Sequence, residues 1–347
     1  MKNKNRLHFN ILLILFFFFG NHLIFSQEIK DISDTCSAGF RGLSVVNDSL
    51  IWLGGTKGTV GISNNGGKKW KWIKVKNHTT LDFRSIYGFD EKRAVIANAG
   101  FPATILITDD GGENWKQVYR SFDSSMFFDG MDFWDNEHGI IFGDPVKGKM
   151  FVAETKDGGK TWKEIPNEKR PLLETGEASF AASGTTIRTF PKSKIIIASG
   201  GKISRLWYSE NFGTDWTYFK TPIMQGSAST GIFSFAVSGK KIIIVGGDYT
   251  SDSLKKDNNF IGTFPGKKFS APKVSTQGYY SCVELVSKTS VYATGPLGTE
   301  VSLDSGNTWK VIDKTSYNCV RKARNGNAIY FCGAKGKLGK LILKQKS

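Results

Sequence analysis

Short runs of apolar and β-branched residues, bounded by turns rich in Gly, Asn and Asp, recur along most of the chain. They come in pairs, and the clearest pairs are 43–46 with 50–53, 84–89 with 94–98, and 232–237 with 242–245. Runs of this length between turn signals are typical of β-strands, and two runs separated by a short turn are typical of a hairpin. The pattern therefore predicts an all-β protein built from repeated hairpins.

A recurrent segment of the form Ser/Thr-x-Asp/Asn-x-Gly-x-x-Trp, here called a box segment, follows most of these hairpins. The Asp/Asn and Trp positions of the five copies are Asn65 and Trp70, Asp110 and Trp115, Asp157 and Trp162, Asn211 and Trp216, and Asp304 and Trp309. The tryptophans recur about every 45 to 54 residues, except that the last interval is about twice as long and contains a degenerate copy at 266–269. A period of about 45 residues has room for the four strands of a propeller blade.

The two ends of the chain complete the count of blades. After the last box segment come three strand-like segments, 318–324, 328–331 and 338–343, and one further segment, 28–32, precedes the first hairpin. We expect 28–32 to pair as the fourth strand of the last blade, because ring closure removes exposed sheet edges. The sequence thus predicts a seven-bladed β-propeller of four-stranded blades, formed as one domain by 27–347.

The box segments resemble the Asp-box (BNR) repeats of sialidase-type propellers. Their spacing around seven blades is most similar to that of the photosystem II assembly and stability factor family, and this resemblance covers nearly all of 27–347. It implies that the boxes join the third and fourth strands on the face away from the pocket, where their Ser/Thr and Asp side chains can bond backbone N–H groups. It also implies a non-catalytic scaffold that binds a partner protein.

The N-terminus predicts export. Lys2, Lys4 and Arg6 precede an apolar run at 9–19, and Ser26 is a plausible cleavage point, so 1–26 has the form of a signal peptide. The run is shorter than the ~20 residues that span a bilayer, so we expect no transmembrane anchor in the mature chain. We therefore expect a periplasmic or extracellular protein, and a monomer.

The charge of the chain indicates what kind of partner to expect. The net charge is +16, of which the predicted signal peptide carries three positive charges. A balance this basic favours an acidic protein surface or an anionic glycan. Nucleic acid would match the charge, but export argues against it.

Candidate site residues follow from an alignment of the first strand of each blade. The aligned apolar positions are Leu43, Ile86, Met131, Ile187, Phe233, Val283 and Val320. The positions two residues earlier are Arg41, Arg84, Asp129, Thr185, Gly231, Ser281 and Asn318. Residues two apart lie on the same side of a strand, so the alignment predicts a polar ring around the mouth of the central channel. Arg84 and Asp129 would be neighbours there, as an ion pair or as part of a binding site.

Loops near this ring supply further candidates. Asp144, Asp248 and Tyr249 lie in turns between second and third strands, and Glu177 and Arg188 lie in or just after a long connection between the third and fourth blades. Long loops on a rigid scaffold often carry binding sites.

An enzyme remains an alternative. A carbohydrate-active enzyme, such as a glycoside hydrolase, could use a pair from Asp129, Asp144, Asp248 and Glu177, although the Arg-Ile-Pro signature of sialidases is missing after Phe40. A glycan-binding propeller without catalysis lies between the two hypotheses. No metal-ligand cluster or nucleotide-binding motif stands out, so no metal or cofactor is expected.

Four cysteines follow the predicted signal peptide: Cys36, Cys282, Cys319 and Cys332. If Asn325 and Gly326 form a two-residue hairpin turn, Cys319 faces Cys332 at a non-hydrogen-bonded position, where Cα atoms lie ~4.5 Å apart. This geometry predicts a Cys319–Cys332 disulfide, with four reduced thiols as the alternative.

Overall fold

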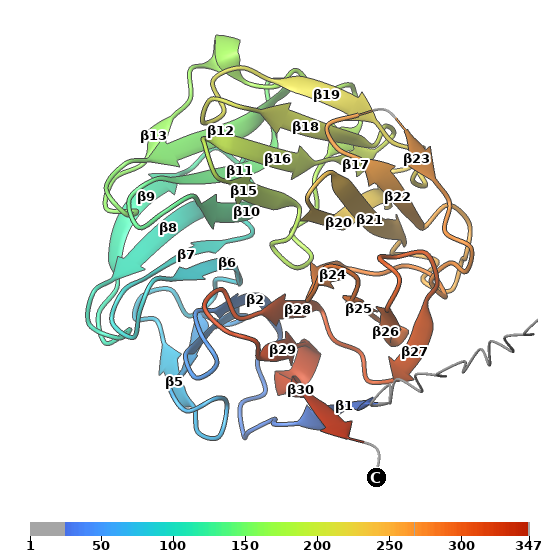
Figure 1. Cartoon of the computed structure of the whole chain (residues 1–347). Coiled ribbons are helices and arrows are strands. Elements are labelled where there is room, and N and C mark those ends of the chain that lie inside the picture. Colours follow the sequence, from blue (N-terminus) through green and yellow to red (C-terminus); the bar gives the residue numbers. More distant parts are fainter. Residues whose placement is uncertain (1–24, 267, 346–347) are drawn as a thin grey trace, which may run out of the picture.

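The chain forms seven antiparallel β-sheets arranged as the blades of a ring (Figure 1). This computed structural model describes residues 25–266 and 268–345, so most of the predicted signal peptide, 1–26, lies outside the described residues. Within the described part, no helix is long and apolar enough to cross a membrane. The all-β, seven-bladed architecture predicted from the repeats is confirmed.

Six blades follow one another along the chain. The first three contain β2 (Phe40–Val45), β3 (Ile51–Gly55), β4 (Thr59–Ser63) and β5 (Lys71–Lys74); β6 (Phe83–Gly88), β7 (Ala94–Asn98), β8 (Ala103–Thr108) and β9 (Lys116–Ser121); and β10 (Phe128–Phe133), β11 (Gly139–Val146), β12 (Lys149–Thr155) and β13 (Lys163–Glu164). The next three contain β15 (Ile187–Phe190), β16 (Lys194–Ala198), β18 (Arg205–Ser209) and β19 (Thr217–Lys220); β20 (Thr230–Ser238), β21 (Lys241–Asp248), β22 (Asn259–Thr263) and β23 (Phe269–Ser270); and β24 (Cys282–Leu285), β25 (Val291–Gly295), β26 (Gly298–Ser302) and β27 (Lys310–Asp313). Two short strands, β14 (Glu177–Ala178) and β17 (Gly200–Gly201), extend the fifth blade to six strands.

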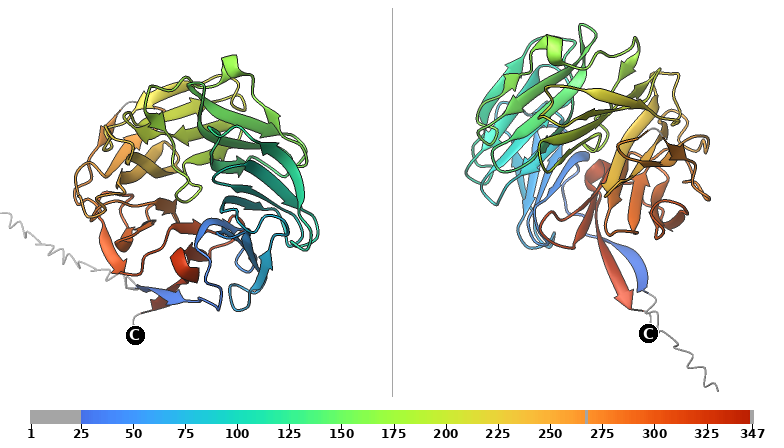
Figure 2. Two further views of the ribbon diagram at one scale, coloured as in Figure 1. Left: turned by 180° about the vertical axis from the view of Figure 1, so that it is seen from behind. Right: turned by 45° about the horizontal axis from the view of Figure 1, so that its top comes forward.

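The seventh blade joins the two ends of the chain. It consists of β28 (Cys319–Lys322), β29 (Ile329–Cys332), β30 (Leu338–Gln345) and β1 (Phe25–Asp31), in the order β1-β30-β29-β28. β1 runs antiparallel to β30, from Phe25 opposite Gln345 to Asp31 opposite Gly339. Figure 1 shows the two strands side by side, and Figure 2 shows them extending beyond the rest of the ring. The prediction that an N-terminal strand closes the ring is confirmed.

Large apolar side chains fill the space between neighbouring blades. Trp52 of the first blade is fully buried in a cluster with Ile86 and Ile96 of the second. Its Nε1 donates to the backbone O of Asp90 at 2.9 Å, so the indole has no unsatisfied polar atom. A Cβ on Gly88 would lie 2.2 Å from the Trp52 ring, so a glycine is needed where the blades meet.

The box segments close the turn between the third and fourth strands. In the second blade, Thr108 Oγ1 donates to Asp110 Oδ1 (2.8 Å) and accepts from Gly112 N (3.0 Å), and Asp110 Oδ1 also accepts from Asn114 N (3.0 Å). Gly112 has φ +83°, a conformation that favours glycine. The Ser/Thr-to-Asp/Asn bond and the bond from the glycine N–H recur in the boxes that begin at Ser63, Thr155, Ser209 and Ser302.

The first strand of each blade, here called the inner strand, lies next to the central channel (Figure 1). It begins at one end of the channel and finishes at the other. The end where the inner strands begin is called the mouth. The end where they finish is called the far end. The box segments lie at the far end, because their backbone bonds reach the turn between the first and second strands, as in Gly111 N to Lys92 O (2.9 Å).

The four cysteines are free thiols, so the Cys319–Cys332 disulfide prediction is wrong in this structure. The predicted register is correct, because Cys319 is the Cα partner of Cys332. The Cys319 thiol is engaged elsewhere: it donates to the backbone O of Ser183 (3.4 Å), and its Sγ lies 4.0 Å from that of Cys282.

The hairpin turn also differs from the prediction. Ala323 N donates to Ala328 O at 2.8 Å, so the turn spans four residues rather than two. Hydrogen-bonded and non-hydrogen-bonded pairs alternate along a hairpin, so Cys319 and Cys332, four positions from Ala323 and Ala328, form a hydrogen-bonded pair.

Replacing the box carboxylate should destabilise the propeller. Asp110→Ala leaves the Asn114 N–H and the Thr108 hydroxyl without their acceptor, and we expect a loss of about 1–2 kcal/mol in the free energy of unfolding. Asp110→Asn should cost less, since Asn65 and Asn211 serve in two other boxes. Urea unfolding measures both, with the adjacent exposed Asp109→Ala as the control. Equal effects of the Asp110 and Asp109 variants would contradict this account of the box.

Candidate functional site

A cavity of about 470 Å³ lies at the mouth of the channel. Five of its lining residues come from the predicted ring or from the aligned strand positions: Arg41, Arg84, Phe233, Ser281 and Asn318. Tyr249, predicted from a second-to-third strand loop, also lines it. The structure therefore brings together six residues that the sequence analysis placed at or beside the mouth.

β-Bulges direct several of these side chains. The pairing of β2 with β3 skips Arg41, that of β6 with β7 skips Arg84, and that of β10 with β11 skips Asp129. A bulge inserts one residue into one strand and turns its side chain away from the regular alternation, and bulges are common beside binding sites. The inner strands of the first three blades thus carry their charged residue at the same irregular point.

The fifth blade has a bulge at the equivalent place, and this corrects the sequence alignment. The pairing of β20 with β21 skips Phe233, so Phe233 rather than Gly231 occupies the mouth position. Gly231 instead packs against Gly200, where an added Cβ would lie 2.5 Å from the Gly200 Cα. The alignment on Phe233 was wrong by two residues, because the strand has a phenylalanine at both 233 and 235 and the equivalent of Leu43 is Phe235.

A loop from the connection between the third and fourth blades fills the middle of the channel. Residues 181–184 are here called the plug, and Figure 1 shows the chain before β15 running into the centre of the ring. The plug carbonyl oxygens accept hydrogen bonds from the surrounding inner strands. The bonds are Arg84 Nη1 to Ala181 O (3.5 Å), Arg41 Nη1 to Ala182 O (2.9 Å), Cys319 Sγ to Ser183 O (3.4 Å) and Arg321 Nη2 to Gly184 O (3.1 Å).

Thr185, another predicted site residue, anchors the plug instead of facing the cavity. It is fully buried, and its hydroxyl donates to Ser234 Oγ at 2.6 Å and lies 2.5 Å from Ser183 Oγ. Its role in this structure is to fix the loop on the inner strands.

Two arginines, Arg41 and Arg84, and one acid, Asp252, line the cavity. Arg84 Nε pairs with Asp82 Oδ2 at 2.7 Å, and not with Asp129, which was one of the two alternatives from the sequence. Arg41 has no ion pair among the described residues and donates to the carbonyl of Ala182. Burial lowers the pKa of Arg41, and the nearby charge of Arg84 lowers it further. The Arg41 guanidinium thus lacks a carboxylate partner within the described part of the chain, which favours binding of an anionic group beside it.

Aromatic side chains form one wall of the cavity. Phe180 stacks on Phe233 with ring centroids 3.8 Å apart, and Tyr279 packs edge-on against Phe233 at 4.6 Å. Tyr249 lies 6.0 Å from Phe233 and remains 53% exposed. This wall offers a large apolar surface directly beside the two arginines.

Asp129, a predicted ring residue, does not line the cavity. It is fully buried, and neither carboxylate oxygen has a hydrogen-bond partner among the described residues. Burial, followed by the repulsion of Asp144, raises the pKa of Asp129 well above its ordinary value. Burial also raises the pKa of Asp144 to about 6, although Ser179 N donates to its Oδ1 at 3.3 Å. Asp144 therefore takes up a proton in the mildly acidic range, and Asp129 holds its proton to a higher pH than an ordinary aspartate does.

Three other predicted site residues have different surroundings. Glu177 is buried in an ion pair with Arg205 and accepts further bonds from Ser199 Oγ (2.5 Å) and Trp207 Nε1 (3.2 Å), so it holds the long connection in place. Asp248 accepts from Thr250 N (2.9 Å) within its own turn. Arg188 lies towards the far end of the channel, where it pairs with Glu284.

Comparisons with known proteins agree with this fold. No protein-family model matches the chain, and no curated protein matches it. A solved structure described as YCF48 bound to D1 peptide has 16% identity and a TM-score of 0.66, covering 90% of this chain and 96% of that chain. YCF48 from Cyanidioschyzon merolae has 16% identity and a TM-score of 0.66, covering 90% of this chain and 98% of that one. The WD40 β-propeller domain of Doa1 has 12% identity and a TM-score of 0.63, with coverage of 92% and 97%.

These similarities define a class rather than an activity. The chain is a seven-bladed β-propeller, and its structural neighbours include YCF48. At 12 to 16% identity, the likeness shows the fold alone.

The buried acids should make stability depend on pH. The folded state binds the protons of Asp129 and Asp144 more tightly than the unfolded chain, so their contribution to stability is greatest below the unfolded pKa near 4. The contribution of Asp144 is lost as pH rises through about 6, and that of Asp129 is lost as pH rises through its own raised pKa. Asp129→Asn should therefore raise the free energy of unfolding at pH 7 and have little effect at pH 4.

Urea unfolding at several pH values between 4 and 7 checks this sign. The exposed Asp109→Asn is the control for loss of one negative charge. An Asp129→Asn variant that is less stable than wild type at pH 7 would contradict the description of a buried, unpartnered carboxylate.

Proposed function

We propose that the chain is an exported, non-catalytic propeller scaffold that binds a protein partner through its mouth face, in the manner of an assembly factor. The observation that carries the proposal is the cavity of about 470 Å³ in which Arg41 and Arg84 adjoin an aromatic wall. Arginine and aromatic residues are the side chains that most often dominate protein interfaces. The segment recognised would carry an acidic group beside a large apolar side chain.

Exposed apolar residues around the mouth support a protein partner. Phe101 (57% exposed) and Phe122 (68% exposed) contact each other with ring centroids 6.3 Å apart. Leu172 and Leu254 are also exposed, and all four lie on connections at the mouth. Large exposed apolar side chains on one face of a soluble protein often mark an interaction site.

The neighbouring structures and the sequence supply further support. A YCF48 structure of similar fold is described as bound to D1 peptide, so a propeller of this shape can hold a peptide. Export to the periplasm or the extracellular space is supported by the sequence of 1–26, and the Asp-box relationship by the box segments. The basic net charge is consistent with an acidic protein surface, and an anionic glycan would satisfy the same two arginines.

A carbohydrate-active enzyme is a second candidate, because Asp144 lies near the mouth with a pKa of about 6. A glycosidase needs two carboxylates facing the substrate. Asp129 is fully buried, and Glu177 is held by Arg205. The one acid that lines the cavity is Asp252, and Asp144 is not among the lining residues, so the predicted carboxylates do not face the cavity as a pair. The geometry therefore favours binding over hydrolysis.

A peptide array tests the proposal. The mature protein is applied to acidic, neutral and basic peptides, each made with and without a Phe residue, and binding is quantified by fluorescence anisotropy. We expect preference for acidic peptides that contain Phe. Arg41→Gln combined with Arg84→Gln should weaken that binding at least about tenfold, because the anionic group loses both charged donors.

The control is Lys240→Gln combined with Lys241→Gln, which removes the same charge from an exposed turn at the far end. Equal loss of binding in both double variants would indicate a general charge effect and contradict the proposed site. Turnover of fluorogenic glycosides by the wild type that is abolished by Asp144→Asn would replace the scaffold proposal with the enzyme.

A further inference from the structure

The far end of the channel carries a second ring of residues. In each inner strand, the ring residue directly follows the aligned apolar residue, with Phe235 in place of Phe233 in the fifth blade. The ring consists of Ser44, Tyr87, Asp132, Arg188, Ala236, Glu284 and Arg321. All seven line two adjoining cavities of about 90 and 350 Å³. The ring lies three residues, or about 10 Å, along each strand from the mouth ring.

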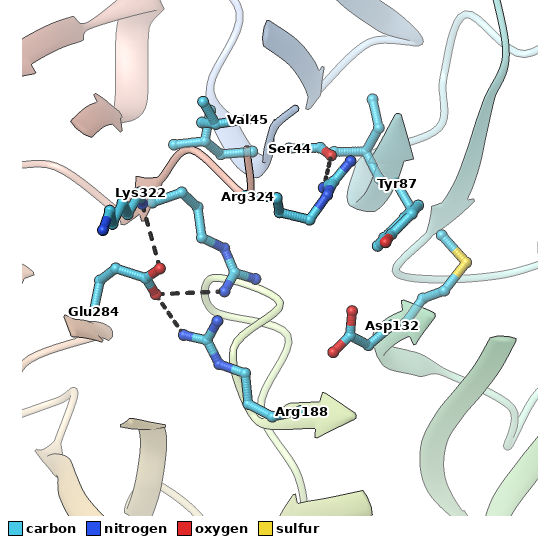
Figure 3. Close-up of a pocket in the computed structure, with 12 residues that line it drawn as sticks. Ser44, Val45, Tyr87, Asp132, Arg188, Glu284, Lys322 and Arg324 are labelled. Atoms are coloured by element: carbon cyan, nitrogen blue, oxygen red, sulfur yellow. Dashed lines mark hydrogen bonds and ion pairs between the residues drawn. The ribbon is translucent and has the colours of Figure 1, made fainter. Parts of the chain in front are cut away.

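Positive charge predominates in these cavities. Arg188, Arg321, Lys322 and Arg324 line them, whereas the acidic lining residues are Glu284 and Asp132. Glu284 Oε2 accepts from Arg188 Nη2 (2.6 Å) and lies 3.8 Å from Arg321 Nη1, so one carboxylate is shared between two guanidiniums. Figure 3 shows Glu284 and Asp132 on opposite sides of the cavity, with Arg188 and Arg324 between them.

The second acid, Asp132, offsets only part of this excess. Asp132 Oδ2 accepts from the backbone N (2.8 Å) and Oγ1 (3.1 Å) of Thr189, and its Oδ1 accepts from Phe133 N (2.9 Å). Its oxygens are thus engaged by neighbouring neutral donors. Arg324 is held at the edge of the cavity by Ser44 Oγ (2.9 Å) and the Tyr87 ring (4.2 Å), neither of which is charged.

A donor in the cluster is left unused. The Nε of Arg188 is buried and has no hydrogen-bond partner within 25–266 and 268–345. A buried N–H of a charged group without an acceptor costs free energy, and an anion would remove that cost. A cluster that served only to join blades would be expected to balance its charges and satisfy its donors.

We propose that the far end of the channel binds a small oxyanion, either inorganic phosphate or a carboxylate group, against Arg188 and Arg321. The inner cavity of about 90 Å³ limits the bound group to a few heavy atoms, and the adjoining cavity of about 350 Å³ leaves room for a molecule that carries it. Paired arginines bind both groups through parallel N–H···O bonds. The site shares no lining residue with the mouth cavity and lies on the other side of the plug.

Isothermal titration calorimetry with inorganic phosphate and with acetate, at ionic strength held constant with chloride, tests this proposal. We expect saturable binding of one anion per chain, and whichever anion binds more tightly identifies the group. Arg188→Gln should weaken that binding at least about tenfold. Arg41→Gln combined with Arg84→Gln should leave it unchanged, because those residues belong to the mouth site.

Glu284→Gln provides a readout that a purely structural cluster would not give. It removes the carboxylate that contacts both guanidiniums, so phosphate or acetate should bind severalfold more tightly. The midpoint temperature of thermal unfolding should also rise more on addition of the anion than it does in the wild type. Absence of saturable binding of either anion to the wild type would overturn the proposal. So would an affinity that is the same in Arg188→Gln, or that falls in Glu284→Gln.

Discussion

The plug is the feature on which both ends of the channel depend. Its four carbonyl oxygens, from Ala181 to Gly184, accept bonds from inner strands of the first, second and seventh blades. A closed ring of seven blades leaves a central space that a backbone segment can enter only if its polar groups find partners. Arg41 and Arg321 provide such partners from opposite ends. The same bonds that fill the channel therefore hold guanidiniums beside a cavity at each end.

The two ends differ in the side chains that accompany those arginines. At the mouth, bulges direct Arg41, Arg84 and Phe233 towards one cavity, so charge and a large apolar surface occur together. At the far end, regular strand positions place Arg188 and Arg321 around Glu284 in a small, polar space. The first arrangement suits a segment of a protein partner, and the second suits a small anion.

The sequence predicted the ring well because the repeats are local. The box segments and their spacing are enough to predict the blades, and the unpaired segment 28–32 is enough to predict closure by β1. The mouth residues Arg41, Arg84, Ser281 and Asn318 follow from strand alignment in the same way. These predictions need only the periodicity of strands and turns.

The errors have physical causes that act over longer distances. The fifth blade has phenylalanines at both 233 and 235, and only the pairing of β20 with β21 shows that Phe233 is the bulged residue at the mouth. Arg84 pairs with Asp82 instead of Asp129, the partner in one of the two alternatives, and Asp129 is fully buried. The far-end ring was not predicted from the sequence, although its members are easily located, since each directly follows the aligned apolar residue of an inner strand. The sequence alone does not show that these charged residues lie together, because they come from seven strands that are far apart in the chain.

Anomalous diffraction from a crystal of the mature protein soaked in selenate tests the central claim, that the plug separates two anion-attracting sites. The account predicts two separate selenium peaks, one beside Arg41 and Arg84 and one beside Arg188 and Arg321, with continuous density for residues 181–184 between them. A channel in which residues 181–184 do not lie between the two ends would contradict the account. So would a crystal with no selenium peak at either end.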